Sequence, residues 1–342
     1  MKRKTIYIIL SLFLLAILFV SWKVFGPSVT PPDGKYFYIK TGTTFNEMKD
    51  ELVEKKIIAS EDWFDRVAGF MNFNSAKAGK YEISKKMSLV GLVRMLKNGQ
   101  QSAVRFVITK FRLKEDLARK MGQTFEFDSS AAIEFLTNND SLKVYGLDSN
   151  TVMSAVMPDT YSFFWNTNPK RVFQKLFDQW KYFWNEERMK KAADLGFTPL
   201  QVSILASIVD EESNKDSEKQ KIASVYINRL HKNMNMQACP TVKYALRDFG
   251  LKRIYEKHLQ VQSPFNTYIN EGLPPGPICT PQPATIDIIL NAPQTDYLYF
   301  VANSDFSGTH IYTSNYADHQ KYARLFAKAQ NKQDSIRKAN NR

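Results

Sequence analysis

The chain has 342 residues, of which 44% are hydrophobic and 24% are charged, and its formal net charge is +13. This composition is that of a globular protein, and the length allows one large domain or two ordinary ones. The positive charge suits an anionic polymer, anionic lipid headgroups or simply a solvated basic surface. The sequence has no zinc-finger spacing, basic-region helix or RNP-like motif, so no nucleic-acid partner is expected.

The N-terminal segment predicts a membrane anchor. Three basic residues precede Thr5–Trp22, a run without charged residues that is just long enough for a spanning helix. Only Lys23 follows closely, and this asymmetry places the N-terminus in the cytoplasm. A cleaved signal peptide is the alternative, but the run is not followed by the small residues of a cleavage site. We expect a cytoplasmic tail at 1–4 and an uncleaved transmembrane helix at 5–25.

A small α+β module is predicted at 35–103, after a stiff, proline-rich linker at 26–34. Apolar periodicity and capping residues define its elements. They are a strand at Tyr36–Lys40, helices starting at the caps Thr44 and Ser60, a strand near Lys80–Ile83, and a helix from Ser88 closed by Gly99. This order and size resemble a LysM module.

A larger α+β domain is predicted at 104–330, and a polar, basic tail at 331–342 is expected to fray. The expected elements are a strand at Val104–Thr109 and helices at Lys114–Met121 with a stop at Gly122, Asp128–Phe135, Pro169–Asp194, Thr198–Ser213 and Ser217–Asn233. We interpret the aromatic stripe of the Pro169–Asp194 helix as core. The fold class is therefore α+β, with a transmembrane helix, a small module and a larger domain.

The helix that starts at Thr198 ends in three consecutive acids. At about 100° per residue, its apolar positions share one broad arc. Glu212 falls near the middle of that arc, whereas Asp210 and Glu211 fall on the polar side. A carboxyl group in apolar surroundings has a raised pKa and can act as a general acid. The alternative is that the helix frays and Glu212 reaches water.

Rigid, proline- and glycine-rich loops follow these helices. They carry Gln237, Asn266 and Tyr268, neutral groups that could bind sugar hydroxyls, although such loops are as often structural turns. Cys239 and Cys279 match no zinc spacing, and the four histidines are scattered, so we expect no metal site and no cofactor. A disulfide and two separate thiols are equally compatible with the sequence.

Several motifs occur together in one order. They are Ile204–Ser213, Ala223–Leu230, Met236–Gln237 with Pro240–Val242, Phe265–Tyr268, Gly272–Gly276 and Tyr297–Val301, with Pro158–Tyr161 as a further match. Each is weak alone, but the ordered set resembles the endolytic murein transglycosylases, or YceG-like family, over nearly the whole chain. The resemblance implies an enzyme of the inner membrane, with its bulk in the periplasm, that cleaves peptidoglycan strands.

The resemblance also assigns roles. It makes Glu212 the catalytic acid/base of a non-hydrolytic cleavage of the MurNAc-β-1,4-GlcNAc bond that leaves a 1,6-anhydro-MurNAc end. We expect substrate contacts from five residues within the motifs, namely Gln237, Asn266, Tyr268, Ser213 and Thr241. Peptidoglycan strands and peptidoglycan synthases are the implied partners, and release or termination of nascent strands is the implied role. Candidates for a second carboxylate are Asp210, Glu211 and Glu218, and Asp210 is expected to help set the helix end.

Two positions depart from the family pattern. Cys239 stands where the family usually has an acidic residue, and Met153-Ser154 replaces a Glu-Gly pair. Because Cys239 and Cys279 lie in loops expected around the site, a bridge between them is a further prediction. Two functions compete with the main one, namely a non-catalytic envelope scaffold that binds glycan through the LysM-like module, and an ordinary hydrolase.

Overall fold

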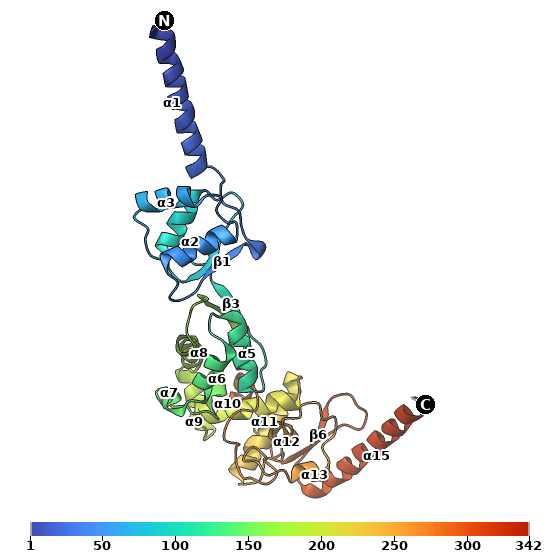
Figure 1. Cartoon of the computed structure of the whole chain (residues 1–342). Helices are drawn as coiled ribbons and strands as arrows, with labels where there is room; N and C mark the ends of the chain where they lie inside the picture. Colours follow the sequence, from blue (N-terminus) through green and yellow to red (C-terminus); the bar gives the residue numbers. More distant parts are fainter. Residues whose placement is uncertain (1, 341–342) are drawn as a thin grey trace. The chain divides into compact units, whose positions relative to one another are not determined.

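The computed structural model describes residues 2–340, which divide into two compact units (Figure 1). The first unit runs to Phe106 and includes Met121–Asp128 and Tyr161–Pro169, and the second contains Val107–Lys120, Ser129–Thr160 and the chain from Lys170. Residues 1 and 341–342, the ends of the two predicted tails, lie outside the described residues.

The chain starts with helix α1 (Lys2–Phe25), in the segment predicted as an anchor. Residues 3–25 are long and apolar enough to cross a membrane, and their most apolar stretch is not buried in the protein. Exposed side chains such as Leu12, Phe13 and Phe19 surround the helix. A helix that is hydrophobic all round is suited to a lipid environment.

The small module that follows has the predicted elements. They are β1 (Tyr36–Ile39), α2 (Phe45–Glu54), α3 (Glu61–Phe70), β2 (Gly79–Glu82) and α4 (Leu89–Asn98), preceded by the 3-10 turn η1 (Asp33–Lys35). β1 and β2 are antiparallel, with Phe37 opposite Tyr81. Thr44 forms a capping box with Glu47, and Gly99 ends α4 in the left-handed conformation, as the capping signals predicted.

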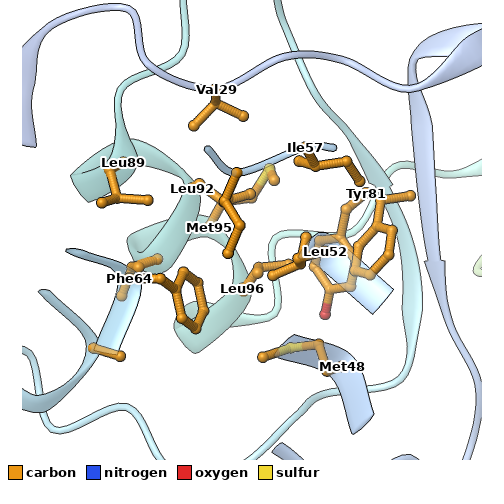
Figure 2. Close-up of a cluster of buried hydrophobic side chains, with 14 of the residues drawn as sticks. Val29, Met48, Leu52, Ile57, Phe64, Tyr81, Leu89, Leu92, Met95 and Leu96 are labelled. Atoms are coloured by element: carbon orange, nitrogen blue, oxygen red, sulfur yellow. The ribbon is translucent and has the colours of Figure 1, made fainter. Parts of the chain in front are cut away.

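One face of each helix of this module is buried in a common core. Figure 2 shows Leu52 of α2, Phe64 of α3 and Leu92 of α4 in this core, together with Tyr81 of β2. All four side chains are fully buried. Because apolar residues three and four positions apart share a helix face, the spacing in the sequence predicted the buried faces of α2 and α4, which include Leu52 and Leu92.

Further along the chain, β3 (Val104–Ile108) forms a two-stranded sheet with β4 (Asp159–Phe163). The predicted stop at Gly122 is wrong, because α5 runs from Lys114 to Thr124. An internal glycine costs a helix only about 1 kcal/mol, and the buried Leu117 and Met121 hold α5 to the core on one side.

The helix predicted at Pro169–Asp194 is two helices, α8 (Pro169–Phe183) and α9 (Glu186–Asp194). Between them, Asn185 has extended backbone angles, and its side chain accepts a hydrogen bond from the backbone N–H of Arg188. Asparagine caps a helix start efficiently, so the chain ends one helix and begins another here. Before α8 lie α6 (Ser129–Thr137), α7 (Asn139–Lys143) and η2 (Val152–Ala155).

The second unit is built around α10 (Pro199–Glu212) and α11 (Asp216–His231). The elements that follow are α12 (Cys239–Leu246), α13 (Glu256–Leu259), α14 (Pro283–Leu290), the antiparallel pair β5 (Tyr299–Ala302) and β6 (His310–Thr313), and α15 (Tyr316–Asn340). The prediction of a frayed tail from residue 331 is wrong for the described part, because α15 continues through it.

Candidate active site

Helix α10 is anchored at its start and buried along most of its length. Thr198 and Gln201 form a capping box, and Pro199 occupies the first turn, as Thr-Pro predicted. Every residue from Val202 to Asp210 is buried. The helix ends at Glu212 because Ser213 has extended backbone angles. Three neighbouring acids therefore emerge at one end of a rigid, buried helix.

The first acid, Asp210, lies in a buried polar cluster. Its carboxylate is 2.7 Å from Nζ of Lys219 and accepts hydrogen bonds from the Thr285 hydroxyl at 2.6 Å and the Gln282 backbone N–H at 2.9 Å. Asp210 lies on the polar side of the helix, as expected, but that side is not open to solvent, because α11 and the N-terminal end of α14 cover it. The pairing of Asp210 with Lys219 ties α10 to α11.

The second acid, Glu211, faces two cations. Its carboxylate oxygens are 2.7 Å from Nζ of Lys110 and 2.8 Å from the guanidinium of Arg112. Lys110 also donates to the backbone carbonyl of Asp210. With both oxygens beside cations, Glu211 stabilises the segment after β3 against the end of α10.

The third acid, Glu212, has a neutral partner instead. The hydroxyl of Tyr226, a buried residue of α11, donates a hydrogen bond of 2.6 Å to Oε1 of Glu212. Among the side chains that the structure describes, those of residues 3–336, no cation lies within ion-pair distance of this carboxyl. Burial raises the pKa of Glu212 to about 7, although the Tyr226 hydrogen bond and the positive charge of Lys243 oppose the rise. Polar groups such as the Tyr226 hydroxyl lie beside Glu212, and its removal from water, rather than a purely apolar lining, gives a carboxyl that is partly protonated near neutral pH.

Two further groups lie in the electrostatic field of Glu212. The Sγ atom of Cys239, at the start of α12, is 3.2 Å from the hydroxyl of Tyr268. Burial raises the pKa of both groups, and the charge of Glu212 contributes to each rise. The structure therefore brings residues from α10, α11, α12 and the 263–268 loop around one protonatable carboxyl.

Of the five predicted substrate contacts, three have at least partly exposed side chains. Gln237 is exposed and accepts a hydrogen bond of 3.2 Å from Arg229, while Tyr268 and Ser213 are partly exposed. Oγ of Ser213 accepts a hydrogen bond from the backbone N–H of Lys215. These three residues stay predicted substrate contacts.

The other two, Asn266 and Thr241, are fully buried. The Asn266 amide donates to the carbonyls of Leu259 and Val261, and its oxygen accepts from the Tyr268 N–H. Thr241 donates to the carbonyl of Ala238. These bonds shape the loop that presents Tyr268, and a direct contact of Asn266 or Thr241 with sugar stays untested.

The predicted bridge between Cys239 and Cys279 is wrong, because both cysteines are free thiols. Cys239 is paired with the Tyr268 hydroxyl, whereas the buried Cys279 donates weakly to the carbonyl of Ser207 on α10. Each sulfur thus has its own partner.

Glu218 of α11 also has structural hydrogen-bond partners. Its buried carboxylate accepts hydrogen bonds from the backbone N–H of His310 and the hydroxyl of Tyr312 on β6. Burial alone would raise the pKa of Glu218, but bonds from His310 and Tyr312 outweigh it and lower the pKa. Within the described residues, no group of three or more His, Cys, Asp or Glu could hold a metal ion.

Tyr226 is the site residue that sequence reasoning missed. Its periodicity placed it correctly in the core of α11, but its hydroxyl had no assigned role. The available signal was a tyrosine among otherwise apolar core positions, since a buried tyrosine hydroxyl usually has a hydrogen-bond partner. Its partner depends on the packing of α11 against α10.

Comparison with known proteins places the chain in a family. Residues 37–325 match the YceG-like family. A protein of Bacillus subtilis named endolytic murein transglycosylase is 26% identical over 86% of this chain and 85% of its own. A Streptococcus pneumoniae protein of the same name is also 26% identical, over 83% of this chain, but the match spans only 56% of that longer protein.

A solved structure shows the same fold. The crystal structure of a yceG-like protein from Listeria monocytogenes matches 84% of this chain and 98% of its own, with a TM-score of 0.55 and 25% identity. The match to the family covers the small module as well as the domain that contains Glu212. This chain belongs to the YceG-like family.

Proposed function

We propose that this protein is a membrane-anchored lytic transglycosylase that cuts peptidoglycan strands internally, at the MurNAc-β-1,4-GlcNAc bond. The observation that carries the proposal is the state of Glu212, whose buried carboxyl has a pKa of about 7 and a tyrosine hydroxyl as its partner. The relatives named endolytic murein transglycosylase supply the substrate class.

The proposed chemistry needs one carboxyl in two protonation states. Protonated Glu212 donates its proton to the glycosidic oxygen as the bond from C1 of MurNAc to that oxygen breaks. The C6 hydroxyl oxygen of the same MurNAc attacks C1, and the Glu212 carboxylate takes the hydroxyl proton. The products are a free GlcNAc hydroxyl and a 1,6-anhydro-MurNAc end, and water is not consumed.

A single acid/base also suits this site. Hydrolysis by inversion or retention normally needs a second carboxylate facing the same sugar. The candidates are held elsewhere, since Asp210 is paired with Lys219, Glu211 with Lys110 and Arg112, and Glu218 with β6. This distribution favours the non-hydrolytic reaction over an ordinary hydrolase.

The proposed location is the inner membrane, with α1 as a single span, the N-terminus in the cytoplasm and the bulk in the periplasm. The basic residues at the start of α1 support this orientation. An enzyme held beside the membrane would meet strands as they are made, so we also propose a role in terminating nascent strands next to peptidoglycan synthases.

Digestion of purified glycan strands tests the proposal. Wild-type protein should create internal cuts with anhydro-MurNAc ends, detected by mass spectrometry, and Glu212→Gln should lose at least about 100-fold in rate because it removes the general acid. Glu211→Gln is the matched control and should retain most of the activity if the protein folds.

The products decide between the competing functions. Reducing MurNAc ends would indicate a hydrolase. Binding of strands with no cleavage by wild-type protein would indicate the glycan-binding scaffold. Cleavage by Glu212→Gln at the wild-type rate would disprove the role of Glu212.

A further inference from the structure

The end of α1 and two helices of the small module enclose an apolar groove of about 550 Å³. Val20, Val24 and Phe25 line it from α1. The other side is formed by α3, chiefly Trp63 and Phe70, and by α4. Figure 1 shows α1 ending beside this module, and Val24 packs against the module's core.

The groove exposes large apolar side chains that a water-facing surface would normally not carry together. Phe70, at the end of α3, is 91% exposed, and Phe25 of α1 is 70% exposed. Exposed apolar clusters of this kind mark surfaces that contact a partner or a membrane.

Cations border the same groove. Arg66 of α3 and Arg94 of α4 line it and are exposed, and neither has an ion-pair partner among the described residues. By contrast, the acids Glu61 and Asp65 of α3 are paired with Lys49 of α2 at 2.8 and 3.0 Å. The positive charges at the groove are therefore left for an anionic group.

The groove also lies where the membrane boundary would be. Val20 to Phe25 is the last stretch of the apolar helix and spans about 7.5 Å at 1.5 Å per residue. The headgroup region of a bilayer is roughly this thick. A module joined to that stretch by side-chain packing is held at headgroup depth once α1 spans the bilayer.

We propose that this groove binds phospholipid of the membrane that α1 crosses, with acyl-chain carbons against Phe70, Trp63 and Val24 and the phosphate at Arg66 and Arg94. The module is then an interfacial membrane-binding element, and the anchor and the module form one membrane contact. The proposal rests on α1 spanning the membrane and is independent of the chemistry at Glu212.

Depth measurements on the full chain in phospholipid nanodiscs test the proposal. A nitroxide label at Phe70→Cys should be accessible to oxygen and shielded from a water-soluble nickel complex. Glu54→Cys, an exposed site on α2 that does not line the groove, is the matched control and should show the reverse. Unmutated protein treated with the same reagent corrects for labelling of Cys239 and Cys279.

Two further variants separate the causes of any failure. A label at Leu15→Cys reports whether α1 spans the bilayer. If the Leu15 label is accessible to the water-soluble nickel complex, α1 does not span the bilayer, and the proposal is overturned. The double variant Arg66→Glu/Arg94→Glu should make the Phe70 label accessible to nickel, because the phosphate contacts are lost.

The decisive case is the one in which the Leu15 label lies deep in the bilayer. If the Phe70 label is then as accessible to nickel as the Glu54 label, the groove faces water and the proposal is overturned. A Phe70 label shielded from both oxygen and nickel would indicate a protein partner instead, which also contradicts it. In each case, cleavage of glycan strands by the same samples tests the proposed role of Glu212 separately.

Discussion

Asp210, Glu211 and Glu212 are adjacent on α10, yet only the first two have cations as partners. Asp210 pairs with Lys219 and Glu211 with Lys110 and Arg112, whereas Glu212 receives a hydrogen bond from the uncharged Tyr226. A nearby cation favours the ionised carboxylate, whereas burial without one favours the protonated acid. Of the three acids, Glu212 is therefore the one whose pKa is raised, as the proposed general acid requires.

Tyr226 should tune the pH dependence of the reaction. Its hydrogen bond favours the charged form of Glu212 and so lowers a pKa that burial has raised. In Tyr226→Phe the pKa should rise further, by about one unit for a hydrogen bond to a charged group. The alkaline limb of the rate–pH profile should therefore move to higher pH by the same amount. An unchanged limb with a lower rate at every pH would mean that Tyr226 only supports packing.

Glu212 should also make stability depend on pH. Its pKa is about 7 in the folded protein against an ordinary value of 4.5, so the folded state holds the proton more tightly. This stabilisation is full below pH 4.5 and is lost as pH rises through 7. Relative to Glu212→Gln, the wild type should lose up to about 3 kcal/mol of unfolding free energy between pH 4.5 and 8. Urea unfolding at both pH values measures this difference, and a constant difference would contradict it.

The sequence singled out Glu212 as the candidate acid but could not identify the groups that surround it. The helical arc depends only on residue spacing, so it could place Glu212 on the inward-facing side of α10, where burial raises its pKa. It also placed Asp210 on the polar side but could not show that this side is buried, because α11 and α14, which cover it, are distant in sequence. The partners Tyr226 and Lys219 are set by that same packing.

Elements with strong local signals were predicted well, and the errors occur where local signals compete. The small module follows its caps and apolar periodicity, including the Thr44 capping box and the Gly99 end. By contrast, α8 and α9 have helix-forming residues on both sides of Asn185, and only its cap bond shows the break. The polar segment of α15 has no strong stop signal, and it continues as helix.

The contact between α10 and α11 depends on the buried pair Asp210–Lys219. In Lys219→Met the carboxylate of Asp210 would stay buried without its cation, which typically costs about 3–5 kcal/mol of unfolding free energy. Thermal or urea unfolding of this variant measures the loss. Lys190→Met, which breaks an exposed pair with Asp194, is the matched control and should change stability little. Equal effects of the two substitutions would contradict a special role for the buried pair.

At the scale of the whole molecule, one chain combines an apolar helix at one end, a small module and a larger domain that contains Glu212. The net charge is +13. This positive charge suits a protein that is proposed to act beside anionic lipid and on a glycan whose peptide stems carry carboxylates. A high net charge of opposite sign raises the local concentration of a charged polymer and speeds association.

Binding to peptidoglycan should therefore weaken as salt is added. Raising ionic strength from about 50 mM to about 500 mM shortens the screening length from roughly 14 Å to roughly 4 Å, so attraction between exposed charges falls while sugar contacts at the site remain. We expect the fraction of Glu212→Gln protein that sediments with purified sacculi to drop several-fold over this range. Sacculi with amidated carboxylates are the control, and their binding should be weaker and less sensitive to salt. Equal, salt-independent binding to both would show that the positive charge serves the membrane surface rather than the substrate.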